Sequence, residues 1–268
     1  MVKSKRLNHK KVFVIGMLLV LSSGLFANTN TKLDITGSQL LNLAGKQRML
    51  SQRIAKDYLY IGKNIATTKA NKQLKESIDS FLLAHRKLSS SIKNEEVKNL
   101  LLFVQLSSDE FKGIASKKFT LDNAQLILDL SESMLEGSQY VFDSLKSSSK
   151  VKKSMMIDKS TEQRMLSQRI AKYYISYQLG IKDKNSIDMM IDTVKQFSYN
   201  LDILIKNPSN TPQISEKLLK IEKLWKIVHK FYNNIEKGGL PLIVFNTTDN
   251  ITKKMDEVTK MYLLSYKY

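Results

Sequence analysis

The sequence predicts an all-α protein made of two tandem up-and-down four-helix bundles that follow an N-terminal signal segment. Three observations predict this class. Only 3 prolines and 10 glycines occur among 268 residues, which is too few turn-forming residues for a β-sandwich or a barrel. A decapeptide occurs twice, and apolar residues recur at helical spacing along the chain.

The first 27 residues resemble a secretory signal peptide. Five basic residues lie within the first eleven, residues 12–21 are apolar apart from one glycine, and small residues precede Ala27. We expect cleavage after Ala27 and a periplasmic mature protein. The apolar run is shorter than the roughly 20 residues that span a bilayer. If residues 12–27 are not cleaved, they would anchor the protein in the inner membrane, and no later segment approaches a membrane span.

An internal repeat organises the remaining chain. The segment Gln47–Lys56 recurs without change as Gln163–Lys172, at an offset of 116 residues, and Phe81 and Phe197 stand at the same offset. A unit of this length holds four helices with short connections. We therefore predict one four-helix domain at 34–148 and a second at 150–268.

Helix boundaries follow from start signals and breaks. Asn94-Glu-Glu96 and Thr120–Asn123 are typical helix starts, and the segments 207–212 and 238–241 contain Pro and Gly that end helices. The predicted helices of the first unit are 36–67, 71–93, 95–116 and 121–147. Those of the second unit are 152–181, 185–206, 213–236 and 241–266.

Arginine usage singles out the repeated decapeptide. The chain has six arginines against thirty-seven lysines, and four of the six lie in the two copies: Arg48, Arg53, Arg164 and Arg169. A planar guanidinium fork fits planar oxyanions such as carboxylate or nitrate, whereas lysine supplies a plain charge. The pattern indicates that the geometry of the fork matters at these positions.

The two arginines of each copy point to different helix faces, about 140° apart. Arg48 shares its face with small residues, including Ala44 and Gly45, so it is expected in a partly dry helix seam that holds either an anion or a structural salt bridge. Arg53 could pair with Asp57 at i,i+4. Because Tyr173 replaces that acid in the second copy, Arg169 is expected to be exposed.

The glutamines that precede Arg48 and Arg164, Gln47 and Gln163, fall on the core-facing stripe. They would either orient the arginines or make satisfied polar contacts between helices. If the chain turns near Ser147–Ser149, the bundles lie side by side and the two arginines could face each other. If a helix runs on unbroken, they lie roughly 40 Å apart.

Several function classes are disfavoured by composition. Without cysteine, and with three histidines, the chain offers neither a zinc site nor a Cys or Ser/His catalytic set. We expect no enzyme activity, no metal and no cofactor. The excess of lysine is interpreted as a solvated surface, so no nucleic-acid partner is inferred. We expect His85 and His229 on the polar surface and Trp225 in the core.

Residues 42–56, which include the decapeptide, resemble the signature of the PilJ/NarX-like sensor domain. This is the periplasmic four-helix module of type IV pilus chemotransducers and nitrate/nitrite sensor kinases. The resemblance implies that Arg48 grips the anion at a seam between two first helices of a dimer, with Ala44, Gly45 and Gln47 lining the site. Arg164 with Gln163 is the second candidate.

The second copy departs from the first beside the arginine. Asp158, Ser160, Thr161 and Glu162 stand where the first copy has Asn42, Ala44, Gly45 and Lys46, and added acids disfavour an anion there. Two functions remain open. One is an exported recognition protein for nitrate, nitrite or another small anion, with a membrane-bound receptor, histidine kinase or chemotransducer as partner. It would act either as a monomer or as a homodimer. The other is an envelope interaction protein linked to type IV pili or chemotaxis that binds no ligand.

Overall fold

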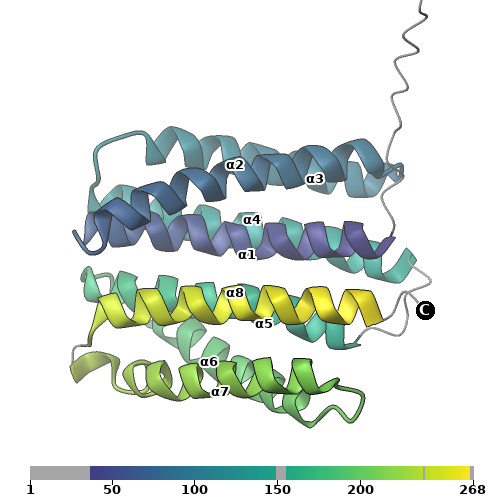
Figure 1. Cartoon of the computed structure of the whole chain (residues 1–268). Helices are drawn as coiled ribbons and strands as arrows, with labels where there is room; N and C mark the ends of the chain where they lie inside the picture. The colour runs from purple at the N-terminus through teal and green to yellow at the C-terminus, as the bar shows by residue number, and fades with distance from the viewer. Residues whose placement is uncertain (1–36, 149–154, 238, 266–268) are drawn as a thin grey trace, which may run out of the picture. The chain divides into compact units, whose positions relative to one another are not determined.

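The computed structural model describes residues 37–148, 155–237 and 239–265. In these ranges the chain forms eight α-helices and one short 3-10 helix, without a β-strand (Figure 1). The all-α class is confirmed. The expected signal segment at 1–27 and the connection at residues 149–154 lie outside the described residues.

The first four helices begin and end within five residues of their predicted limits. They are α1 (Gly37–Gly62), α2 (Thr67–Ser91), α3 (Glu95–Ala115) and α4 (Leu121–Ser148). Both predicted start signals act as N-caps: Asn94 Oδ1 accepts from the Val97 amide at 3.1 Å, and Thr120 Oγ1 accepts from the Asn123 amide at 3.1 Å. These bonds satisfy amide groups that the first helical turn leaves without partners.

The second four helices are α5 (Met155–Gln178), α6 (Lys184–Lys206), α7 (Pro212–Tyr232) and α8 (Pro241–Ser265), and the 3-10 helix η1 (Ile235–Lys237) precedes α8. Thr211 caps α7, whose first residue is Pro212. Proline suits this position because the first helical amide needs no partner inside the helix.

Both motif-bearing helices end earlier than predicted, and in the same way. Asn64 after α1 and Gly180 after α5 have left-handed backbones, with φ of 60° and 100°. The amide of the next residue, Ile65 or Ile181, returns to a carbonyl of the last helical turn, at 3.0 and 3.1 Å. This is a Schellman end, which Gly or Asn permits. The two stop residues are 116 positions apart, as the motif copies are.

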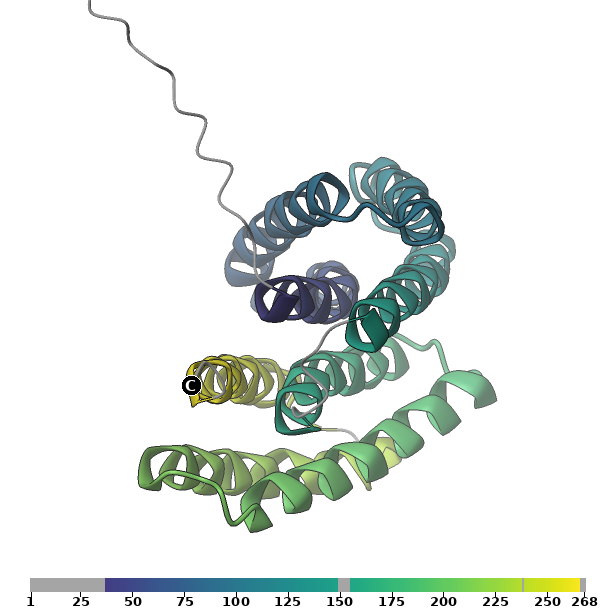
Figure 2. The same cartoon turned by 90° about the vertical axis from the view of Figure 1, so that its right-hand side faces the viewer.

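The helices α1 and α5 lie side by side at the centre of the described structure (Figure 2). Helix α1 packs along α5 as extensively as along α2 and α4, and α5 also packs against α6 and α8. The contacts between α2 and α3 are few. The side-by-side alternative is therefore the one observed, and polar residues of both central helices become buried because helices surround them.

Candidate functional site

The two copies of the motif face each other along the seam between α1 and α5, and the two helices run parallel in the register of the repeat. Gly45 packs against Thr161, and Arg53 Nε lies 3.5 Å from Gln168 Oε1 further along. A Cβ atom on Gly45 would come within 1.9 Å of Thr161 Cγ2. The small residue at position 45 thus serves close helix approach, and at this level the seam holds protein atoms on both sides.

Arg164 is buried and held by protein groups. Its Nη1 donates to Asp256 Oδ1 on α8 at 2.5 Å, and its Nη2 donates to Asn42 Oδ1 on α1 at 3.0 Å. Burial lowers the pKa of Arg164, and Asp256 opposes this shift. An anion at Arg164 would have to displace a carboxylate that the protein supplies.

Arg48 is equally buried but differently surrounded. The residue is only 2% exposed, and its Nε and Nη1 atoms have no hydrogen-bond partner among the described residues. The guanidinium lies over the ring of Phe142 on α4, 4.6 Å from the centroid. Burial lowers the pKa of Arg48, while Glu162 and Asp158 act in the opposite direction. One face of the planar guanidinium is covered by the ring, and the donors on Nε and Nη1 are left to bind something else.

The neighbours predicted with the arginines take different places. Ala44 is buried in an apolar cluster with Phe142 and residues of α2 and α3. Gln47 Nε2 lies 3.3 Å from His85 Nδ1, and Gln163 Nε2 donates to the Phe197 carbonyl at 3.0 Å. The Oε1 atom of each glutamine has no partner among the described residues. Each amide therefore ties its helix to the following one and keeps a free acceptor in the core.

Two lysines of the motif are fully buried, Lys56 and Lys172, although the helical pattern does not predict this. Lys56 on α1 donates to Asp249 on α8 at 2.6 Å, and Lys172 on α5 donates to Glu132 on α4. Each lysine thus crosses from its own group of four helices to the last helix of the other group. Burial raises the pKa of Glu132, but Lys172 and Arg169 outweigh it and lower the pKa to about 2. The signal available in the sequence was the identity of these lysines in both copies.

Arg53 and Arg169 face the same acids as the two buried lysines, Asp249 and Glu132, and two expectations about these arginines are wrong. Arg53 approaches Asp249 at 4.0 Å rather than pairing with Asp57, whose Oδ1 lies 3.3 Å from Lys56 Nζ. Arg169 is not exposed: its side chain is 16% exposed and its Nη2 bonds Glu132 at 2.5 Å. The i,i+4 spacing predicted the wrong environment because the acids, Asp249 and Glu132, lie on other helices that are distant in the sequence.

The expectation for His85 is also wrong, because it is 6% exposed rather than on the surface. Helix α2 packs on α1, which brings His85 to Gln47, and burial lowers its pKa. Trp225 lies in the core as expected, 7% exposed and with its ring centroid 4.1 Å from that of Phe197.

Asp57 is a buried acid without a hydrogen bond. It is fully covered, and neither carboxylate oxygen accepts a hydrogen bond among the described residues, although Lys56 Nζ forms an ion pair with Oδ1 at 3.3 Å. Burial raises its pKa to about 7, against the opposing effect of Lys56. A folded-state pKa above the ordinary value of 3.8 means that the folded protein binds this proton more tightly than the unfolded chain does. Because the unfolded chain releases this proton at a lower pH than the folded protein does, the free energy of unfolding falls as the pH rises towards about 7.

We expect Asp57→Asn to stabilise the protein by about 1–3 kcal/mol near pH 8 and by much less near pH 5. Asparagine keeps the shape of the side chain but cannot ionise, so the variant does not lose stability as the pH rises. Urea denaturation across this pH range measures the difference. The control is Asp188→Asn, whose side chain is 51% exposed. A stability difference that stays constant with pH would contradict the assignment.

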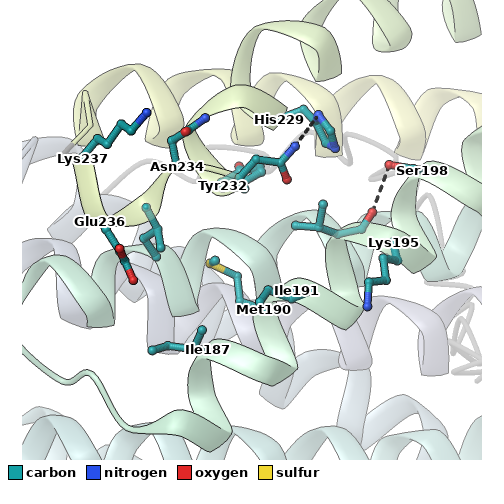
Figure 3. A pocket seen from close by; sticks show the side chains of 13 residues that line it. Ile187, Met190, Ile191, Lys195, Ser198, His229, Tyr232, Asn234, Glu236 and Lys237 are labelled. Atoms are coloured by element: carbon teal, nitrogen blue, oxygen red, sulfur yellow. Dashed lines mark hydrogen bonds between the residues drawn. The ribbon is translucent and has the colours of Figure 1, made fainter.

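A pocket lies away from the motif, between α6 and the segment that runs from α7 into η1. Its volume is about 730 Å³. Figure 3 shows Ile187, Met190 and Ile191 of α6 on one side, facing His229 and Tyr232 of α7 on the other. Its lining of apolar and polar side chains suits a small amphipathic molecule, but it contains no residue of either motif copy.

Comparison with known families bears on the motif. Residues 36–100 match the family model described as the type IV pili methyl-accepting chemotaxis transducer N-terminal domain, PilJ. This segment is PilJ-like. The match covers α1, α2 and the start of α3 and includes Arg48, which confirms the resemblance of the first copy. The second copy lies outside the matched PilJ segment and stays a prediction. No curated protein and no solved structure matches the chain.

Two further properties concern the described residues alone. None of their helices combines the length and apolar character needed to cross a bilayer. Within the same ranges, no group of three or more His, Asp or Glu side chains is placed to hold a metal ion.

Proposed function

We propose that this chain is an exported sensor-type protein that recognises a small planar anion, nitrate or nitrite by resemblance to PilJ/NarX-like domains. It passes its state to a membrane-bound receptor, histidine kinase or chemotransducer. The PilJ-like segment supports a role in chemotaxis or type IV pilus signalling. The residues 34–148 and 150–268 act as two related units, of which the first carries the ligand site.

The observation that carries this proposal is that two nitrogen atoms of the buried Arg48, Nε and Nη1, have no hydrogen-bond partner among the described residues. A buried guanidinium with two donors unused is costly unless a counter-charge arrives. Stacking on Phe142 fixes the plane of the guanidinium, and the unused Nε and Nη1 donors lie in that plane, where each can form a charge-assisted hydrogen bond to an oxyanion. Arg164 keeps its carboxylate partner Asp256, so the two seam arginines divide into an anion-binding one and a structural one.

Burial of Arg48 supplies a means of signalling. Because the residue is 2% exposed, an anion reaches it only when α1, α4 or α5 moves. A ligand that binds one helix arrangement better than another shifts the population towards that arrangement. Nitrate binding would therefore be coupled to displacement along the α1–α5 seam, and a partner that contacts these helices would sense it.

The test is a calorimetric titration of the mature protein with nitrate and nitrite. We expect Arg48→Lys to weaken binding about ten- to a hundredfold, because lysine keeps the charge but loses the fork. Arg53→Lys and Arg164→Lys should have smaller effects, since both side chains already contact protein groups. If Arg53→Lys is the more damaging change, or if neither anion binds the wild type, the proposal fails.

The alternative function is an envelope interaction protein without a ligand, and one surface favours it. Helix α3 exposes Leu102, Phe103 and Leu106, at 57%, 47% and 63%. Large apolar side chains that gather on a surface often mark protein contacts. Absence of heat with nitrate and nitrite, together with loss of partner capture on changing these three residues to serine, would favour this class.

A further inference from the structure

Two clefts occupy equivalent positions in the two halves. The first, of about 370 Å³, lies between α1, α2 and α8, and we name it the Lys46 cleft. It is lined by Lys46, Met49, Arg53, Lys69, Gln73, Asp249, Thr252, Lys253 and Asp256. The second, the Glu162 cleft, lies between α5, α6 and α4 and has at matching positions Glu162, Met165, Arg169 and Met189. Each of these four is 116 residues from its counterpart.

The two clefts differ in charge. Four cations and two acids line the Lys46 cleft, whereas three glutamates and one arginine line the Glu162 cleft. The key exchange is Lys46 for Glu162. Glu162 is occupied by hydrogen bonds from Gln196 and Asn200. One cleft has thus become electropositive and the other acidic.

Both acids of the Lys46 cleft are already compensated from outside its lining. Asp249 accepts from the buried Lys56 at 2.6 Å, and Asp256 accepts from Arg164 at 2.5 Å. Lys46 has no ion pair or hydrogen bond to another described residue that the structure records, and it is half-buried. Burial lowers the pKa of Lys46 against the opposing effect of Asp256, and the nearby Arg164, Lys260 and Arg53 lower it further. Asp249 also faces two cations of the cleft, Lys69 at 3.5 Å and Arg53 at 4.0 Å, and with Lys46 and Lys253 in addition the cleft keeps an excess of positive charge.

The spacing of the cations indicates the shape of the anion. Lys46 and Arg53 are seven residues apart on α1, so they share a face and stand about 10 Å apart along the helix axis. Met49 lies between them on the cleft wall, and Thr252 lines the cleft from α8. A cationic group at each end with the Met49 side chain between them suits two carboxylates joined by a short aliphatic chain better than it suits a single oxyanion.

We propose that the Lys46 cleft binds a short-chain dicarboxylate, with Lys46 at one end and Arg53 at the other. This site goes beyond the proposed anion site at Arg48, which lies about 160° from Lys46 around α1. Because α8 belongs to the second group of helices, the ligand holds the two halves together, and the Glu162 cleft rejects it through like charge.

The experiment is calorimetric titration of the mature protein with succinate and glutarate, and with butyrate as the matched monocarboxylate. We expect a dicarboxylate to bind the wild type and butyrate to bind far more weakly. Lys46→Gln should weaken dicarboxylate binding about tenfold or more. Lys46→Glu should abolish dicarboxylate binding, because it gives position 46 the same acid that the second copy has at position 162. The matched control is Lys195→Gln, whose side chain is 72% exposed on α6.

The outcomes separate this site from the one at Arg48. Arg48→Lys should leave succinate binding unchanged, and Lys46→Gln should leave any nitrate binding unchanged. The proposal is overturned if neither dicarboxylate binds the wild type, if butyrate binds as tightly, or if Lys46→Gln titrates like Lys195→Gln. Thermal melts verify folding of each variant, and the exposed Lys253→Gln gives a second variant in the same cleft with an expected smaller loss.

Discussion

Replacing Lys172 with Met should lower the free energy of unfolding by about 3–5 kcal/mol. Lys172 is fully buried and bonds both Ser131 Oγ, at 2.9 Å, and Glu132 on α4. Without the ammonium group, the mostly buried Glu132 keeps only Arg169 as a cationic partner among the described residues. Because the pair joins α5 of one group to α4 of the other, its loss also weakens their packing. Urea denaturation near neutral pH measures the change.

A matched control distinguishes this buried pair from an ordinary surface one. Lys184→Met removes a lysine from an i,i+4 pair with Asp188, whose side chains are 88% and 51% exposed. We expect a change within about 0.5 kcal/mol there. Adding Glu132→Gln to Lys172→Met should restore only a small part of the loss, because it removes the unpaired acid but leaves Arg169 without its carboxylate partner. Equal costs for the two lysine changes would show that the buried pair contributes nothing special.

The second large effect is expected for Gly45→Ala, about 2–3 kcal/mol of destabilisation. The added Cβ would stand 1.9 Å from Thr161 Cγ2, so α1 and α5 must separate. In an ordinary helix the same change is favourable by about 0.5–1 kcal/mol. Gly113 in α3 offers that comparison, because no described atom lies within 4 Å of the position that a Cβ would take there.

The substitution Thr161→Ala tests whether the contact with Thr161 causes the destabilisation by Gly45→Ala. It removes the methyl group that the new Cβ would meet, so Gly45→Ala combined with Thr161→Ala should recover most of the stability. Gly113→Ala should be neutral or stabilising in the same denaturation series. If Thr161→Ala does not relieve the effect of Gly45→Ala, the two helices do not meet at these residues.

The helices could be predicted from local information. Caps such as Asn94 and Thr120 and the Pro212 start act within a few residues, so a single sequence reveals them. The ends of α1 and α5 were placed too late because the left-handed residues Asn64 and Gly180 stand in a run of otherwise helix-compatible side chains. A local pattern tells where a helix can form, and the stop residue decides where it ends.

The candidate site was only partly predictable. The scarcity of arginine directed attention to Arg48 and Arg164, and both are buried in the structure. The sequence did not indicate that Arg164 bonds a carboxylate whereas Arg48 leaves its Nε and Nη1 donors unused. Asp256 is 92 residues from Arg164 in the sequence, and no periodicity connects positions so distant.

The sequence by itself determined the all-α class, the repeat and most of the helix boundaries, because these depend on composition and on contacts within a few residues. Only the tertiary structure decided which charges meet. The parallel packing of α1 on α5 brings Lys56 to Asp249 and Lys172 to Glu132, and it buries residues that a lone amphipathic helix would expose to water. The partners of a buried charge come from whichever helix packs against it, and that choice is made by the whole fold.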